Sequence, residues 1–377
     1  MLYFIKLLKI LIHTKIEFKF PKKREILLFD AEGNNSAQKI LKNNEYTIFH
    51  ARNEKFNFFI LIKCIVKFYF KFNFLKYAQT YLEFVDPKIV ITFIDNNYSF
   101  YLLNKKKYKS IVIQRGNRSY HNDILEKFKK NKDKFTVDYF FVFNNSYAEH
   151  LKKYIKSNYL LLGSPLSNLV NIKQTKKNGI CYVSTFSMDT YKYAKKNKNF
   201  YEKYYQSELI FLKKFSNFLK SKKIKFYILG KFKNKISQKI EKEFYTKELN
   251  NFKYIVNSKK RNTFSLLHKF KMIIGISSTL NLESFGRNIK TFFISQRLSN
   301  YPFNTKRFGY FANLKKNGIC WSSTETNSII IKKIMNLYKM NNKEWDLIYK
   351  KFNDISGCHY NYKNLKLINL IKLLKKN

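Results

Sequence analysis

Residues 272–294 read MIIGISSTLNLESFGRNIKTFFI, and this stretch decides the fold of the second half of the chain. Residues 272–276 form a short apolar run, which is typical of a buried strand. Residues 279–288 carry apolar side chains at helical spacing, and residues 291–294 are again short and apolar. The order strand, helix, strand predicts a parallel α/β sheet.

The turn from the first of these strands into the helix consists of small hydroxyl residues, Ser277, Ser278 and Thr279. The first N–H groups of a helix have no partner within it, and the helix dipole is positive at that end. A diphosphate is therefore the expected ligand of this turn. The alternative is that the three residues act only as helix caps.

Two charged residues follow on the same helix, Glu283 and Arg287. The apolar positions Leu282 and Phe285 are expected to face the sheet, so this pair is expected on a different face, away from the core. One interpretation is an ordinary surface ion pair between residues four apart. The other places Glu283 within reach of a ribose hydroxyl pair and Arg287 beside the phosphates.

The same alternation of strands and helices runs through the whole chain. In the first half, strands are expected at 25–30, 46–51, 88–95, 110–116, 138–144 and 159–163, with helices at 58–77 and 146–154. In the second half, strands are expected at 179–184, 225–229, 252–256, 272–276 and 291–294, with helices at 200–222, 236–249, 263–270 and 279–288. Apolar strands separated by helices predict two parallel, doubly wound sheets.

Several pieces of the chain, taken in order, resemble bacterial surface-carbohydrate biosynthesis proteins, the enzymes of O-antigen and capsule assembly. ISSTLNLESFGRNIKTFFI at 276–294 is similar to the STLxxE-and-Arg block of that family. The other pieces are ILLFD at 26–30, IVITFIDNN at 89–97, IVIQRGNR at 111–118, DYFFVF at 138–143, NGICYVSTF at 178–186, RFGYF at 307–311 and GICW at 318–321. The resemblance extends over residues 24–355.

The resemblance implies the GT-B fold, in which two Rossmann-like domains face a cleft. It implies four parts: a basic apolar segment at 1–24, an acceptor domain at 25–165, a donor domain at 178–325, and C-terminal helices at 326–377 that cross back to the first domain. It also implies that the STLxxE block holds a nucleotide-sugar. The predicted donor residues are Gly230, Lys231, Ser277, Ser278, Thr279, Glu283, Arg287 and Arg307.

Polar residues also follow the strands of the first half, where ligands of α/β sheets gather. Sugar transfer with inversion needs a base, and a carboxylate is the usual choice, so Asp95 is the first catalytic candidate and Glu32 the second. Asp95 can equally be a helix cap or a loop hydrogen-bond acceptor. The predicted acceptor-binding residues are Asp30, Asn96, Gln114, Arg115 and Arg118.

The formal net charge of +49 comes overwhelmingly from Lys. Lys, Asn, Ile, Phe and Tyr are abundant together, a composition typical of AT-rich genomes, and the chain has none of the motifs that recognise specific nucleic acid sequences. Such a charge still favours an anionic membrane surface. Residues 1–20 are too short and too charged for a membrane span, and they predict either a surface helix on the inner leaflet or a packed N-terminal helix. Residues 56–77 are a second candidate for membrane contact, and otherwise a crossover helix.

No metal or cofactor is expected. The four cysteines are far apart and lack a metal-ligand spacing, and Cys64 and Cys181 are predicted to be small buried side chains. No DxD pair is present to hold a divalent cation on a diphosphate, so helix N-termini and basic side chains are expected to do so.

The predicted function is a cytoplasmic, metal-independent glycosyltransferase on the inner membrane. It would move a sugar from a nucleotide-activated donor to a lipid-linked or glycan acceptor. The alternatives are a nucleotide-sugar epimerase or polyol-phosphate transferase on the same fold, and a non-catalytic basic protein on membrane or nucleic acid.

Overall fold

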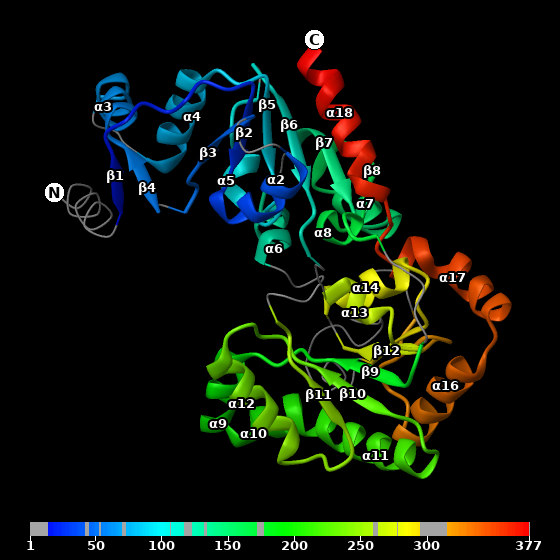
Figure 1. Ribbon diagram of the computed structural model, residues 1–377. Coiled ribbons are helices and arrows are strands. Elements are labelled where there is room, and N and C mark those ends of the chain that lie inside the picture. The colour runs from blue at the N-terminus through cyan, green and yellow to red at the C-terminus, as the bar shows by residue number, and fades with distance from the viewer. Residues whose placement is uncertain are drawn as a thin grey trace.

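The computed structural model describes residues 14–41, 45–52, 54–69, 73–105, 107–116, 123–131, 134–171, 177–258, 263–276, 278–294 and 315–376 (Figure 1). Two six-stranded parallel sheets, one in each half of the chain, form the body of the molecule. The α/β class with two parallel sheets, predicted from the sequence, is confirmed.

The first sheet has the strand order β3-β2-β5-β6-β7-β8. Its strands are β2 (Ile26–Phe29), β3 (Tyr46–Phe49), β5 (Ile89–Thr92), β6 (Lys109–Ile113), β7 (Phe135–Val142) and β8 (Ile155–Leu161). Every residue of β2 and β5 is buried, because helices cover both faces of the sheet.

The helices of this half are α2 (Asn34–Ile40), α3 (Phe58–Lys67), α4 (Phe74–Val85), α5 (Tyr98–Tyr101), α6 (Asp123–Lys129), α7 (Asn145–Leu151) and α8 (Pro165–Asn168). The single helix expected at 58–77 was wrong. Asn73 accepts a hydrogen bond from the N–H of Lys76 and so starts a separate helix, α4. A two-stranded parallel sheet, β1 (Lys15–Glu17) with β4 (Lys55–Asn57), stands beside α3 at the outer end of this domain (Figure 1).

The second sheet has the order β11-β10-β9-β12-β13-β14. Its strands are β9 (Ile180–Val183), β10 (Phe226–Leu229), β11 (Lys253–Ile255), β12 (Met272–Gly275), β13 (Thr291–Ile294) and β14 (Trp321–Ser322). In the centre, Ile274 of β12 pairs with Tyr182 of β9 and Phe292 of β13. The short apolar runs predicted at 272–276 and 291–294 are therefore neighbouring buried strands.

The helices of this half are α9 (Met188–Lys196), α10 (Lys198–Tyr201), α11 (Ser207–Ser221), α12 (Lys235–Thr246), α13 (Thr263–Leu267), α14 (Thr279–Gly286), α16 (Asn327–Lys339) and α17 (Asn342–Ser356). One turn of π-helix, Glu202–Gln206, joins α10 to α11. Asn341 opens α17 with a capping box, in which its side chain accepts from the N–H of Glu344 and the Glu344 carboxylate accepts from the N–H of Asn341.

After α17 the chain returns to the first domain. Gly163, which follows β8, pairs with Tyr360. A Cβ on Gly163 would lie 1.5 Å from the carbonyl oxygen of His359, and its φ of +76° also favours glycine. The last helix, α18 (Leu365–Lys376), then packs on one face of the first sheet (Figure 1).

Cys64 and Cys181 are buried and free, as expected. Among the described helices, none is long and apolar enough to cross a bilayer.

Candidate functional site

The two domains approach each other where β6 ends and α14 begins. Gly116 follows β6, and a Cβ on Gly116 would lie 3.7 Å from Oγ1 of Thr279, the first residue of α14. Ser278 caps α14 by accepting a hydrogen bond from the N–H of Leu280 at 3.3 Å. Thus the N-terminus of α14 faces the strand ends of the first domain, although Ser277 lies outside the described residues. This is the edge at which α/β sheets bind ligands.

Asp30, directly after β2, is a buried carboxylate with three partners. It accepts hydrogen bonds from the N–H of Glu32 at 3.0 Å, from Nε of Arg52 at 3.1 Å and from Nδ2 of Asn97 at 2.8 Å. Its φ of +83° is a strained value for a non-glycine residue, and these bonds hold it there. Because its lone pairs are engaged within the protein, Asp30 positions the strand ends around it.

Glu32 is the exposed carboxylate of the same cluster. It forms ion pairs with Nη2 of Arg52 at 2.6 Å and with Nη1 of Arg115 at 2.5 Å. The side chains of Arg52 and Arg115 are each about half exposed, so both can exchange Glu32 for a ligand anion. Glu32 and the two arginines therefore form a charged rim around the strand ends of the first domain.

Asp95 lies after β5 and is buried beside this rim. Its Oδ1 accepts a hydrogen bond from the backbone N–H of Arg115 at 3.1 Å. The helix-cap alternative for Asp95 was wrong, since Asn97 caps α5. Asp95 does act as a loop hydrogen-bond acceptor, since it accepts from the Arg115 N–H. This contact does not test a catalytic role.

The other predicted acceptor residues differ in their surroundings. Asn96 is exposed on the turn next to Asp95. Gln114 is buried, donating to the carbonyl of Gly116 at 3.0 Å and accepting from the N–H of Phe143 at 2.8 Å, so it ties the ends of β6 and β7 together. Arg118 lies outside the described residues, as does the predicted donor residue Arg307.

In the second domain, a buried carboxylate fixes the loop after β10. Both oxygens of Glu241 accept from the N–H of Lys231 at 3.0 Å, and the hydroxyl of Tyr254 donates to Oε2 at 2.9 Å. A Cβ on Gly230 would lie 2.1 Å from that hydroxyl oxygen, so glycine is required here by close packing. The side chain of Lys231 remains exposed at the carboxyl end of β10.

The predicted surface pair on α14 was wrong. Glu283 is buried and Arg287 half-buried, because the segment that links the domains covers this face of the helix. Arg287 donates from Nε to Oγ of Ser167 at 2.7 Å, and from Nη2 to the carbonyls of Ser167 and Val170. Its guanidinium also stacks on the ring of Tyr360, 4.5 Å away. In this structure Arg287 joins the two domains.

Glu283 sits in the same junction. Burial raises the pKa of its carboxyl to about 7, although a hydrogen bond with Ser164 and the charge of Arg287 act in the opposite direction. Burial of the imidazole, together with the charges of Arg287 and Lys177, lowers the pKa of His268 to about 4. A carboxyl that changes charge near neutral pH is therefore placed between α14 and the interdomain link.

Sequence reasoning did not find three residues of this region, Arg52, Glu241 and Asn281. Arg52 had one usable signal, since Arg is rare in this Lys-dominated chain. Glu241 and Asn281 gave none, because their roles depend on tertiary contacts. The Asn281 amide is buried with no hydrogen-bond partner among the described residues, and it packs on Gly275, where a Cβ would lie 2.2 Å from its Nδ2.

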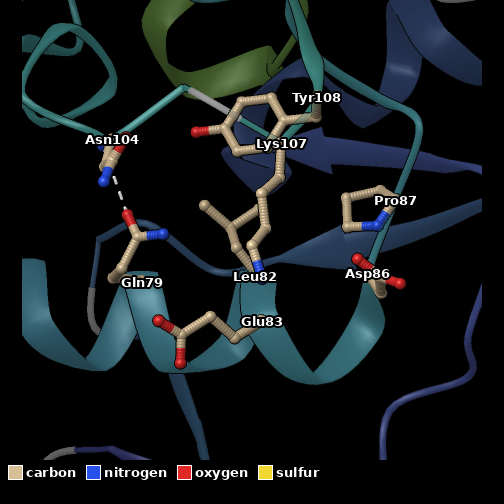
Figure 2. Close-up of a pocket in the computed structure, with 8 residues that line it drawn as sticks. All are labelled: Gln79, Leu82, Glu83, Asp86, Pro87, Asn104, Lys107 and Tyr108. Carbon is tan, nitrogen blue, oxygen red and sulfur yellow. Dashed lines mark hydrogen bonds between the residues drawn. The ribbon is translucent and has the colours of Figure 1, made fainter.

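A cavity of about 140 Å³ lies at the opposite edge of the first sheet, between α4 and the loops that lead into β5 and β6 (Figure 2). It is lined by Gln79, Leu82, Glu83, Asp86, Pro87, Asn104, Lys107 and Tyr108. Because the strands begin there, it is separate from the candidate site.

Residues 111–376 match the family described as "putative O-antigen biosynthesis protein". The chain belongs to this family. No curated protein sequence matches the chain.

Solved structures show the fold of this O-antigen biosynthesis family member. The wall teichoic acid polymerase TagF is 16% identical, with a TM-score of 0.54 over 94% of this chain and 90% of that one. A variant of TagF soaked with CDPG is 15% identical, with a TM-score of 0.52 over the same shares. TarM is 16% identical, with a TM-score of 0.45, and covers 81% of this chain, which spans 59% of the length of TarM. The fold is that of the GT-B glycosyltransferases.

Proposed function

We propose that this protein is a GT-B glycosyltransferase that adds a sugar from a nucleotide-activated donor to a growing bacterial surface glycan. The observation that carries the proposal is the position of the α14 N-terminus opposite the end of β6. A diphosphate at this terminus would meet the positive end of the α14 dipole on one side and the rim of Glu32, Arg52 and Arg115 on the other. The membership of the chain in an O-antigen biosynthesis family supports the glycan as the product.

The proposed donor contacts lie in the second domain. Thr279 and Ser278 begin α14, and Lys231 carries an exposed ammonium at the neighbouring strand end. A helix N-terminus and a lysine neutralise a leaving diphosphate without a metal ion, so catalysis is proposed to be metal-independent. Arg287 and Glu283 would contribute to this site only if the interdomain contacts rearrange on donor binding.

The proposed base lies in the first domain. Asp95 is the first candidate and Glu32 the second, since both carboxylates stand at the strand ends that face α14. A base within hydrogen-bond reach takes the proton of the acceptor hydroxyl as the new glycosidic bond forms. The acceptor, lipid-linked or glycan, would lie against Asp30, Asn96 and Arg115.

Donor binding can be measured by calorimetry across a panel of nucleotides and nucleotide-sugars. Lys231→Ala is expected to weaken binding of the preferred donor by about tenfold, because one phosphate contact is lost. The matched control, Lys233→Ala, removes an exposed lysine two residues away and is expected to bind like the parent protein. Equal affinities for the two variants, or no binding of any nucleotide, would refute the donor site.

Turnover tests the base. Asp95→Asn is expected to lower kcat by about 100-fold or more while the fold persists, because Asn can still accept from the Arg115 N–H. If Glu32 is the base, the loss appears instead in Glu32→Gln. The control is Asp189→Asn, which removes an exposed carboxylate on α9 and should leave kcat unchanged. Full activity in both Asp95→Asn and Glu32→Gln would rule out both candidates.

A polyol-phosphate transferase is the second candidate function. It is favoured by the match to TagF, which covers most of both chains and includes a variant soaked with CDPG. The nucleotide product separates the two reactions. Transfer of a sugar breaks the bond to the diphosphate and releases a nucleoside diphosphate, whereas transfer of a polyol phosphate breaks the diphosphate and releases a monophosphate. An epimerase would convert the donor with no acceptor present.

We also infer that the protein acts at the cytoplasmic face of the inner membrane as a peripheral protein. The formal charge of +49 supports this, since an anionic leaflet attracts basic surfaces. A non-catalytic basic protein would show the same attraction to the membrane. Its membrane affinity would be indifferent to the substitutions at Asp95 and Glu32, and it would have no turnover for them to lower.

A further inference from the structure

Exposed apolar residues lie on α3 and on the segment after β1. These elements stand at the outer end of the first domain (Figure 1). We name this apolar surface the outer surface and define it by five residues. They are Phe18, Phe20, Ile62, Val66 and Tyr69, with exposed fractions of 63%, 56%, 44%, 69% and 86%. A large apolar side chain that is mostly exposed is unremarkable alone, but a cluster of five marks an interaction site.

Ring contacts join the segment after β1 to the start of α3. The ring of Phe18 lies 5.1 Å from that of Phe58, and the ring of Phe20 stacks at 4.2 Å on that of Phe59. Phe58 and Phe59 open α3, and the exposed aliphatic residues of α3 follow one and two turns along the helix. The segment after β1 and the outer side of α3 therefore lie together.

Helix α3 has the sequence FFILIKCIVK, so its only charged residues are Lys63 and Lys67. Its inner side packs Ile60, Leu61 and Cys64 into the core against α4. A helix that carries apolar residues on its outer side as well as its inner side is expected between two apolar layers. Within the described part of the chain, only the inner layer is present.

The elements that carry the outer surface also carry exposed basic residues. Lys67 is compensated by Glu83 at 2.6 Å, and Lys55 by Glu17 at 2.6 Å. Five further basic residues lie exposed on α3 and on the segment after β1, namely Lys19, Lys22, Lys23, Arg24 and Lys63. Exposed apolar and basic side chains on the same two segments match a surface that is apolar beneath and anionic above.

We propose that the outer surface docks on the headgroup region of an anionic lipid bilayer. Ile62 and Val66 enter the boundary with the acyl chains, while Lys63 and the basic residues after β1 contact the lipid phosphates. A second copy of this chain fits poorly, because a symmetric contact would bring the same cations together. The proposal deepens the proposed function, since it names the surface that brings the enzyme to a lipid-linked acceptor.

Sedimentation of the full chain with large vesicles tests the proposal without nucleotide or acceptor. The protein is expected to bind vesicles of mixed phosphatidylcholine and phosphatidylglycerol, and to bind phosphatidylcholine alone weakly. Ile62→Ser/Val66→Ser is expected to lower the partition coefficient by about tenfold or more, because two apolar side chains are lost. Lys19→Gln/Lys22→Gln/Lys63→Gln is expected to lower it by about fivefold for each lysine at low salt.

Matched controls come from the second domain. Ile236→Ser/Leu347→Ser removes two aliphatic residues that are 77% and 70% exposed, and Lys239→Gln/Lys242→Gln/Lys247→Gln removes three exposed lysines. Both controls should bind vesicles like the parent protein, and circular dichroism should show that every variant is folded. A fluorophore on Val66→Cys should shift to the blue on binding, and one on Ile236→Cys should not.

Three results would overturn the proposal: no binding to anionic vesicles, equal losses in the outer-surface and control variants, or an unchanged fluorophore at position 66. None of them would bear on the transferase, because turnover on a soluble acceptor is measured separately. Conversely, a protein that binds vesicles through α3 but has no transferase activity would support the proposal for the outer surface and contradict the proposed function.

Discussion

Glu283 shows how one residue can serve the fold and a candidate site at once. Its carboxyl is buried at the junction of α14 and the interdomain link, next to Arg287 and Ser164. A carboxylate there has too little solvation to hold its charge easily, which is why its pKa lies near 7. The residue therefore links the protonation state of the junction to pH within the physiological range.

Glu283→Gln should change how stability depends on pH. The folded carboxyl keeps its proton up to about pH 7, whereas the unfolded one loses it near 4.5. The folded state thus binds more protons between these values, and Glu283 contributes stability that is lost as pH rises through this window. The free energy of unfolding of the parent minus that of Glu283→Gln should fall by about 3 kcal/mol from pH 4.5 to pH 8.

Urea unfolding at several pH values measures this difference. His268 and His150 also have lowered pKa values, but both are present in parent and variant, so their contributions cancel in the subtraction. Parallel pH profiles for the two proteins would show that Glu283 is ionised in the folded state.

Among the elements, α18 packs on a domain that is far from it in the sequence. Its apolar residues Leu367, Ile371 and Leu374 complete the core on one face of the first sheet, against Ile26, Leu28 and Ile89. Lys375 also pairs with Glu45 at 3.2 Å, near β3. The first domain thus depends on a helix that follows the second domain in the sequence.

Leu367→Ala is expected to lower the free energy of unfolding by about 2–5 kcal/mol, because it leaves a cavity between α18 and the first sheet. Leu373→Ala on the same helix removes a side chain that is 56% exposed, and it should change stability by less than about 0.5 kcal/mol. Thermal or urea unfolding compares the two variants. Similar losses would mean that α18 does not cover the sheet as described.

At the scale of the whole molecule, two crossings hold the domains together. The link after β8 runs through Ser164, Ser167 and Val170, and the return crossing runs through Cys358 and Tyr360. Arg287 contacts both, by hydrogen bonds to the link and by stacking on the return crossing. Arg287 therefore helps to orient α14 toward the first domain, together with the backbone hydrogen bonds from Cys358 to Leu282 and from His359 to Phe143.

Arg287→Lys should weaken the coupling of the domains, because a lysine cannot reproduce the planar fork of hydrogen bonds or the stacking. The expected loss is about 1–3 kcal/mol, and a lower urea m-value or two separate transitions would show that the domains unfold independently. Arg24→Lys, an exposed residue, is the control and should behave like the parent. An unchanged, single transition in Arg287→Lys would show that this side chain does not couple the domains.

The sequence by itself determined the layers of this protein. Apolar runs bounded by small or polar residues, such as 26–30 and 272–276, mark buried parallel strands because only such strands are covered on both faces. The carboxyl ends of those strands also put Asp30, Asp95 and the start of α14 among the candidates, since ligand edges follow from sheet topology. Local signals were sufficient for these features.

Only the tertiary structure decided which faces are covered and which side chains meet. The spacing of Glu283 and Arg287 fits a solvent-exposed pair. In the structure, the interdomain link, more than a hundred residues earlier in the chain, covers Glu283 and binds Arg287. Tyr360, some seventy residues later, stacks on Arg287. Arg52, Glu32 and Arg115 likewise meet only because parallel pairing aligns the ends of separate strands. Periodicity describes a helix face, but burial depends on which distant segment packs against it.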